Sequence, residues 1–145
     1  MDVRLRMIDR SNWEACVRLQ VLPEQQNFVA SNAYSLAQAA YEPDACPMGI
    51  FSDGELAGFI MWDFDSELNM WGMCRLMVDQ KLQGKGIGRA AVEKLLALVT
   101  GKIGHIPFYT SAEPENVTAI HLYEQLGFQN TGRLIDGEVL LIIQL

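Results

Sequence analysis

A glycine-rich segment in the middle of the chain reads Gln83-Gly84-Lys85-Gly86-Ile87-Gly88-Arg89. It follows an apolar run at residues 70–78 and precedes a stretch with apolar residues at helical spacing. Glycines let a phosphate oxygen approach the main chain within hydrogen-bond distance, where a Cβ atom would intrude. Because the segment opens a helix and carries two cations, its backbone N–H groups predict an anion-binding loop.

Other phosphate-binding patterns fit this loop less well. A P-loop requires G-x-x-x-x-G-K-[ST], with a hydroxyl for magnesium, and the sequence lacks that pattern. Residues 86–91 satisfy the dinucleotide pattern G-x-G-x-x-A, but residues 79–85 separate them from the preceding strand, whereas the dinucleotide loop turns directly from strand to helix. No acidic residue lies about twenty positions further on, where the ribose would need one. A merely flexible loop is the remaining alternative.

Before the loop, the sequence predicts a strand, two helices and a hairpin, followed by the strand at 70–78. The first strand is expected at residues 3–7, the helices after residue 11 and at 31–41, and the hairpin strands at 48–51 and 56–62. Ser11-Asn12-Trp13-Glu14 fits a capping box that opens the first helix. Asp53-Gly54 is a strong turn signal between the two hairpin strands.

After the loop, apolar residues at positions 92, 95, 96 and 99 predict an amphipathic helix, and Gly101 is expected to end it in a left-handed conformation. A strand at 106–110, a helix at 119–126 and a hairpin of 128–135 with 139–145 complete the prediction. The order of elements indicates an α+β fold with a mixed sheet. Its strands at 70–78 and 106–110 run parallel, since a crossover helix joins them.

A second motif lies downstream, where residues 116–128 read NVTAIHLYEQLGF. This segment fits N-x-x-A-x-x-x-Y-x-x-x-G-F, and Gln83, Gly86 and Gly88 fit Q/R-x-x-G-x-G/A. With both motifs in this order, the chain resembles GNAT acetyltransferases over essentially its whole length. The resemblance implies one domain, residues 1–145, with a mixed sheet of about seven strands flanked by about four helices. It also implies that the two parallel strands splay apart at the cofactor site.

The resemblance further implies that acetyl-CoA is the co-substrate and that no metal is needed. Its implied binding residues are Leu76, Met77 and Val78 for the pantetheine arm, Gln83, Gly84, Lys85, Gly86, Ile87, Gly88 and Arg89 for the pyrophosphate, and Asn116 and Tyr123. By the same resemblance Tyr123 is the catalytic acid that protonates the leaving thiolate. From the residues alone, Asn116 is more typical of a helix cap and Tyr123 of a core aromatic.

The composition favours a cationic partner. The chain has 145 residues, 50% of them hydrophobic, and a formal net charge of −7. This charge argues against binding to nucleic acid or to an anionic membrane, both of which need clustered Lys and Arg, although solubility alone also explains acidity. No apolar run approaches the roughly 20 residues of a membrane helix, and the three cysteines lack metal or disulfide spacing. We therefore expect a cytoplasmic protein with reduced thiols.

Segments in the N-terminal half and in the middle of the chain resemble one subgroup of this family in particular. Residues 26–32, 35–39, 58–61 and 75–79 are similar to bacterial spermine/spermidine acetyltransferases. This likeness implies direct acetyl transfer to a polyamine, a small cationic amine, and it makes Glu24, Phe28 and Asp63 candidates for binding the substrate. Another small amine or a protein amine as acceptor, and a non-catalytic acyl-CoA-binding module, are the alternatives. The sequence leaves open whether the protein is a monomer or a homodimer.

The general base is not assigned by the sequence. Many GNAT enzymes use a glutamate on a strand, but the corresponding residues 71–75 contain no carboxylate. Glu24, Asp63 and Glu113 are candidates, each of them also typical of a solvated surface charge. Cys74 suggests an acetyl-cysteine route as an alternative, although a cysteine on a buried strand is usually inert.

Overall fold

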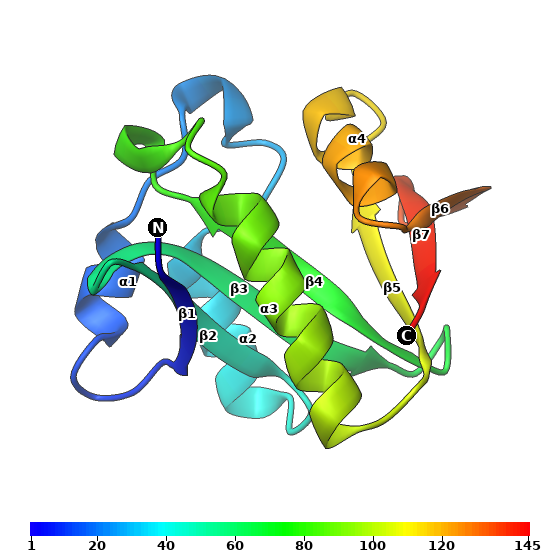
Figure 1. Cartoon of the computed structure of the whole chain (residues 1–145), viewed down its shortest axis with the longest axis horizontal. Helices are drawn as coiled ribbons and strands as arrows, with labels where there is room; N and C mark the ends of the chain where they lie inside the picture. Colours follow the sequence, from blue (N-terminus) through cyan, green and yellow to red (C-terminus); the bar gives the residue numbers. More distant parts are fainter.

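The computed structural model describes all of residues 1–145 and places seven strands in one sheet, in the order β1-β2-β3-β4-β5-β7-β6 (Figure 1). The strands are β1 (Val3–Met7), β2 (Cys46–Ser52), β3 (Glu55–Asp65), β4 (Met70–Val78), β5 (Pro107–Ala112), β6 (Gln129–Ile135) and β7 (Glu138–Gln144). Neighbouring strands run antiparallel except β4 and β5, which run parallel. The predicted α+β fold with a mixed sheet is confirmed.

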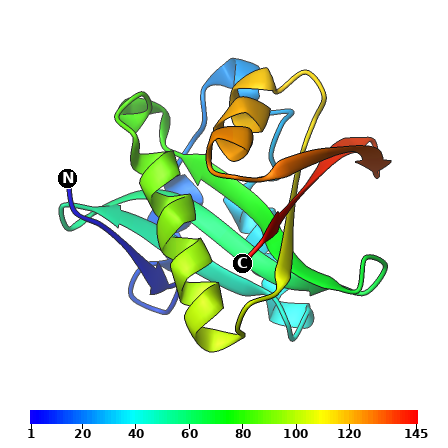
Figure 2. The same cartoon turned by 45° about the vertical axis from the view of Figure 1, so that its right-hand side comes forward.

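Four α-helices flank the sheet: α1 (Trp13–Arg18), α2 (Asn32–Tyr41), α3 (Ile87–Lys102) and α4 (Val117–Gln125). Two short 3-10 helices, η1 (Pro23–Gln25) and η2 (Gln80–Leu82), lie in the connections. Helix α3 crosses one face of β1 to β4, α1 and α2 cover the other face, and α4 lies against β5 and β6 (Figures 1 and 2). No helix has both the length and the apolar character needed to cross a membrane.

Strand β3 carries the hydrophobic core on both of its faces. Ile60 and Trp62 pack into the large cluster beneath α3, whereas Phe59 and Met61 point to the opposite face, into a smaller cluster with Cys16 of α1. This alternation follows from the period-2 geometry of a strand. Strand β4 also contributes to both clusters, with Met73 in the large one and Met77 in the smaller one, although fewer of its residues are buried than in β3.

Strands β4 and β5 diverge soon after they meet. They pair over only three positions, residues 71–73 against 108–110. The hydroxyl of Thr110 donates a hydrogen bond to the carbonyl oxygen of Met73 at 3.1 Å, at the last of these positions. Beyond it β4 continues to Val78 with β3 on one side and no strand on the other. The predicted splay of the parallel strands is therefore confirmed, and Figure 1 shows the opening between them.

An irregularity in β4 lies at the point of divergence. Met61 of β3 is opposite Arg75, but the next residue, Trp62, is opposite Met73, so Cys74 is an additional residue in β4. Such a β-bulge bends the strand that carries it and increases its local twist. The bulge therefore lies directly after the last position at which β4 pairs with β5.

Two helix ends differ from the sequence expectation. The capping box expected at Ser11 to Glu14 is wrong, because α1 has Asn12 at its N-cap and the Ser11 hydroxyl donates to Asp9 Oδ1 at 2.6 Å. The expected left-handed end at Gly101 is also wrong. Helix α3 continues through Lys102, and the residue with positive φ, 117°, is Gly104. An exposed glycine is tolerated in a helix interior at a modest cost, so the helix need not end there.

Candidate functional site

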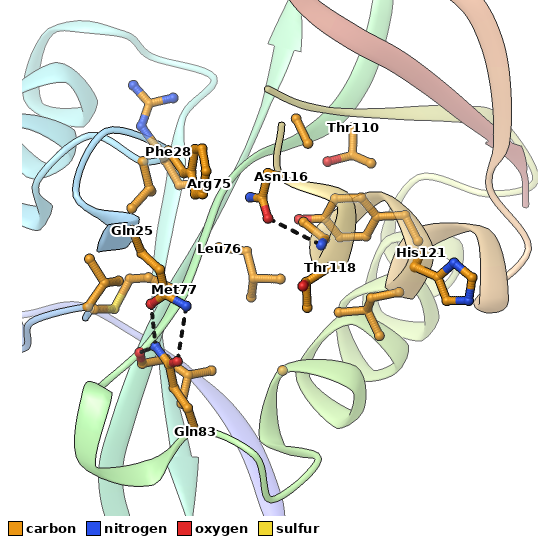
Figure 3. A pocket seen from close by; sticks show the side chains of 18 of the residues that line it. Gln25, Phe28, Arg75, Leu76, Met77, Gln83, Thr110, Asn116, Thr118 and His121 are labelled. Atoms are coloured by element: carbon orange, nitrogen blue, oxygen red, sulfur yellow. Dashed lines mark hydrogen bonds between the residues drawn. The ribbon is translucent and has the colours of Figure 1, made fainter. Parts of the chain in front are cut away.

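A cleft of about 1140 Å³ opens where β4 and β5 diverge. Strand β4 forms one wall, β5 and α4 form the other, and residues of the α1–α2 connection and of the α3 N-terminus also line it (Figure 3). The predicted cofactor residues on its surface are Leu76, Met77, Val78, Gln83, Gly84, Gly86, Ile87, Gly88, Arg89, Asn116 and Tyr123. Lys85 is the exception, because it is exposed and does not line the cleft.

The open edge of β4 supplies main-chain groups to the cleft. Leu76, Met77 and Val78 are opposite Ile60, Phe59 and Gly58 of β3 in the antiparallel pairing. On the other side they have no strand neighbour and line the cleft. An extended chain with amide groups, such as the pantetheine arm, can add to such an edge as a strand would.

The N-terminus of α3 presents uncapped main-chain N–H groups at the cleft. Gly86 is its N-cap residue, with φ at 82°, and no side chain caps the helix. The N–H of Ala90 donates to the carbonyl oxygen of Gly86. The N–H groups of Ile87, Gly88 and Arg89 therefore have no carbonyl acceptor within the helix. With the positive end of the helix dipole behind them, these groups fit a pyrophosphate.

The side chain of Gln83 holds this loop in place rather than reaching into the cleft for a phosphate. Its Nε2 donates to Gln25 Oε1 and to the carbonyl oxygen of Val78, both at 2.9 Å. Gln25 Nε2 donates back to Gln83 Oε1 at 3.2 Å (Figure 3). The pair joins the loop before α3 to η1, and both residues lie on the same side of the cleft, across from Asn116. The sequence motif predicted the importance of Gln83, but nothing in it identified Gln25.

The side chains of Arg89 and Gln125 connect α3 to α4, and Asn116 caps the start of α4. Arg89 of α3 donates from Nη2 to Gln125 Oε1 of α4. Asn116 is the N-cap of α4, where its Oδ1 accepts from the N–H of Ala119 at 3.3 Å, and it also lines the cleft. Asn116 is thus a helix cap and a cleft residue at once (Figure 3).

Tyr123 of α4 is only 5% exposed and lines the cleft. Its ring packs against Phe128 at a centroid distance of 5.8 Å. Burial raises the pKa of Tyr123 to about 12, with a further contribution from the charge of Glu138, while the hydroxyl of Thr110 opposes the shift. The phenol is therefore protonated at neutral pH, as an ordinary tyrosine also is, so a proton is present at this wall of the cleft, although the raised pKa makes the group a weaker acid. It is both the core aromatic and the cleft residue that the sequence suggested.

The thiol of Cys74 is a weak nucleophile at neutral pH. Burial, and after it the charge of Asp63, raise the pKa of Cys74 to about 12. Its Sγ donates to the carbonyl oxygen of Met61 at 3.5 Å. Because the thiolate is the nucleophilic form, a thiol with this pKa is a poor acyl acceptor at neutral pH. All three cysteines are free, and nothing about Cys74 favours the acetyl-cysteine route.

The predicted acceptor-side residues are not all brought together. Glu24 and Phe28 line the cleft, whereas Asp63 lines a separate depression of about 240 Å³ and Glu113 lines neither. Burial raises the pKa of Asp63, and the hydroxyl of Tyr109 donates to its Oδ1 at 2.8 Å. The carboxylates of this depression are Glu42, Asp44, Asp63, Asp65, Glu67 and Asp136.

Sequence reasoning missed Arg75, Ser111 and Glu138, all of which line the cleft. Arg75 donates to Ser35 Oγ at 3.1 Å, to Gln38 Oε1 at 2.9 Å and to the carbonyl oxygen of Cys74 at 2.9 Å. These bonds tie α2 to the bulge of β4. Ser111 Oγ donates to Glu138 Oε1 at 2.8 Å. The spacing of residues in the sequence could not have predicted the contact between residues 111 and 138, because this contact depends on the pairing of β5 with β7.

Comparisons with known proteins agree with this geometry. The profile of the acetyltransferase (GNAT) family matches residues 11–128. The chain is 27% identical, over 152 aligned positions and 100% of both chains, to spermine/spermidine N(1)-acetyltransferase of Bacillus subtilis (strain 168). AAC(6')-Ib in complex with paromomycin and acetyl-CoA superposes with a TM-score of 0.83 at 18% identity, covering 99% of this chain and 94% of that one. PaiA N-acetyltransferase of Thermoplasma acidophilum, in complex with coenzyme A, gives a TM-score of 0.75 at 15% identity over 100% of both chains.

The family profile covers most of the chain and includes both sequence motifs. The solved structures share the fold over nearly the whole length of this chain. The open edge of β4 and the uncapped start of α3 provide the surfaces that an extended thioester carrying a pyrophosphate requires. The chain therefore belongs to the acetyltransferase (GNAT) family and is an acetyl-CoA-dependent N-acetyltransferase.

Proposed function

We propose that this enzyme moves the acetyl group of acetyl-CoA directly to a primary amine of a polyamine such as spermine or spermidine. The observation that carries the choice of acceptor is the similarity to the Bacillus subtilis spermine/spermidine N(1)-acetyltransferase, which extends over the full length of both chains. It thus includes the connection between α1 and α2, from which Glu24 and Phe28 reach the cleft.

Acetyl-CoA supplies an activated acyl thioester, and the chain positions it. In our proposal the edge of β4 at Leu76 to Val78 holds the pantetheine arm, with Asn116 on the opposite wall. The N-terminus of α3 at Ile87 to Arg89 holds the pyrophosphate. Tyr123, protonated and at the far wall, gives its proton to the leaving sulfur. Because the raised pKa of Cys74 makes its thiol a weak nucleophile, direct transfer is favoured over a route through an acetylated enzyme.

The charge distribution supports a polycation as acceptor. Glu24 lines the cleft, and the depression that contains Asp63, Asp65 and Glu67 has no Lys or Arg among its lining residues. Gln38 lines this depression and accepts a hydrogen bond from Arg75 of the cleft, so one hydrogen bond links the linings of the two hollows. A spaced dication gains from separated anionic contacts, each worth about 1 kcal/mol or less when exposed.

The test is a comparison of kcat/KM for spermine, spermidine and a monoamine of similar length at low and at high ionic strength. We expect both polyamines to be preferred at low salt, because the distal ammonium groups find separate carboxylates. The preference should shrink at high salt, since exposed charges are screened. Equal kcat/KM values for the three amines at low salt would contradict the polyamine assignment but leave the acetyltransferase intact.

The same assay distinguishes the alternatives. Higher kcat/KM for aminoglycosides would assign another small amine, and higher kcat/KM for lysine peptides would assign a protein acceptor. Binding of acetyl-CoA without turnover of any amine would indicate a non-catalytic acyl-CoA-binding module. The neutral, cleft-lining phenol of Tyr123 argues against that last outcome.

A further inference from the structure

A carboxylate and a hydroxyl form a pair where β5 and β7 line the cleft. Ser111 lies near the carboxyl end of β5 and Glu138 is the first residue of β7. Ser111 Oγ donates to Glu138 Oε1 at 2.8 Å, and Oε1 is the only side-chain atom of Glu138 with a hydrogen-bond partner. The two ion pairs of the molecule are Arg4 with Asp2 and Arg18 with Glu14, so no protein cation pairs with Glu138.

The alternation of side chains places this pair on the sheet face opposite Tyr123. Phe108 and Ala112 of β5, with Val139 and Leu141 of β7, pack in the same core cluster as Tyr123. Ser111 and Glu138 are each adjacent in sequence to one of these core residues, so they point to the other face. Both sets of side chains nevertheless line the cleft, because it passes between the diverging strands. A phenol and a carboxylate therefore approach the cleft from opposite sides.

The carboxylate lies within electrostatic range of the phenol. The charge of Glu138 contributes to the raised pKa of Tyr123, after burial as the main cause. Both groups line the same cleft, with Glu138 on the sheet face opposite Tyr123. A carboxylate in this position can face an amine that attacks a thioester held beside Tyr123.

The other carboxylates are less suited to this task. Strand β4 has none, and Asp63 and Glu113 do not line the cleft. Glu24, on the short helix η1, and Glu115, just before α4, line it but are exposed, so that water solvates their charges. Glu138 is half-buried, held at Oε1 by Ser111, and has Oε2 free to accept a proton.

We propose that Glu138 is the catalytic base that accepts the ammonium proton of the acceptor, and that Ser111 is its positioning residue. This inference rests on the proposed acetyl transfer. The proton goes from the ammonium nitrogen to Glu138, the freed nitrogen forms a bond to the acetyl carbonyl carbon, and the carbon–sulfur bond breaks. Tyr123 gives its proton to the sulfur and is reprotonated by the second amine proton. Glu138 then releases its proton to water, so that each transfer yields one acetamide, one thiol and one proton.

The test is the Glu138→Gln variant with two kinds of amine at neutral pH, one mostly protonated and one whose pKa lies below the assay pH. The amide still offers Oε1 to Ser111 but cannot take a proton. With the protonated amine, kcat/KM should fall by about 100-fold or more, the usual scale for general base catalysis. With the unprotonated amine the two proteins should agree within about threefold, since the base has nothing to remove.

A matched control is Glu113→Gln, a carboxylate that follows β5 but does not line the cleft. It should leave both rates unchanged. Ser111→Ala keeps the carboxylate and should lose less than Glu138→Gln, again with the protonated amine only. Coenzyme A affinity, measured by calorimetry, should be the same in all variants and shows that they are folded.

An equal loss for both amines would show that Glu138 acts by structure or binding, and it would overturn the inference. Unchanged activity of Glu138→Gln with the protonated amine would overturn it as well. A wild-type protein that binds coenzyme A but acetylates no amine would contradict the proposed function itself, and the inference with it.

Discussion

At the scale of single residues, Tyr123 shows how one side chain serves both fold and chemistry. Its ring belongs to the large core cluster beneath α3, and the residue also lines the cleft. The same burial that stabilises the fold raises the pKa of its hydroxyl to about 12. Since the pKa of an acid rises when its charged form is disfavoured, Tyr123 keeps its proton across the whole range in which the enzyme would work.

Replacing Tyr123 with Phe removes the proton donor and keeps the ring in the core. We expect turnover to fall by about 100-fold or more, because general acid catalysis typically contributes on this scale. In the wild type, activity should not decline between pH 7 and 10 through loss of the Tyr123 proton, because its pKa is about 12. The measurement is kcat across this range under conditions where chemistry limits the rate, with coenzyme A affinity as control. Unchanged turnover would leave Tyr123 with a packing role alone.

At the scale of elements, the loop and the helix that follows it depend on glycines in different ways. Gly86 adopts a left-handed conformation, with φ at 82°, and begins the turn that presents the N–H groups of α3. Gly101 lies inside the same helix, and a Cβ atom added there would meet no atom within 4 Å. The two positions therefore predict opposite effects of substitution.

Gly86→Val should abolish coenzyme A binding in a protein that still folds. A β-branched residue is strained at positive φ, so the turn must rearrange and the anion site is lost. Calorimetric titration with coenzyme A, together with circular dichroism to establish folding, makes the measurement. Unchanged affinity in the folded variant would show that the loop does not bind the pyrophosphate.

Gly101→Ala serves as the control within α3 and is itself a prediction. Alanine is the better helix former, and it restricts the unfolded chain more than glycine does. We expect the free energy of unfolding to rise by about 0.5 to 1 kcal/mol, with coenzyme A affinity unchanged. Urea unfolding curves provide the value. A loss of stability would mean that position 101 requires the left-handed conformation suggested by the sequence.

Most elements could be predicted because their signals are local. Alternation at residues 3–7, the turn at Asp53-Gly54 and the helical spacing around Leu95 all lie within a few residues, and the structure has each element there. The start of α1 could not be predicted in the same way. The Ser11 hydroxyl donates a hydrogen bond to the Asp9 carboxylate instead of capping the helix. A capping pattern in the sequence does not account for such a competing acceptor nearby.

At the scale of the whole molecule, the two motifs predicted the fold and many of the residues that line the cleft, but not Ser111 and Glu138. The motifs lie on either side of β5, so their spacing already implies the two parallel strands. The position of β7 between β5 and β6 carries no such signal, and it is this pairing that brings Ser111 to Glu138. The amide pair of Gln25 and Gln83 likewise joins segments that only the complete fold places together.

The central claim is that this cleft transfers an acetyl group directly from acetyl-CoA to an amine. The most direct measurement is the initial rate of thiol release from acetyl-CoA with spermidine, while both concentrations are varied. The account predicts release that depends on the amine, one acetylated spermidine for each thiol, and intersecting double-reciprocal lines, because both substrates must be bound together. Thiol release that does not depend on the amine, or parallel lines that indicate an acetylated enzyme, would contradict it.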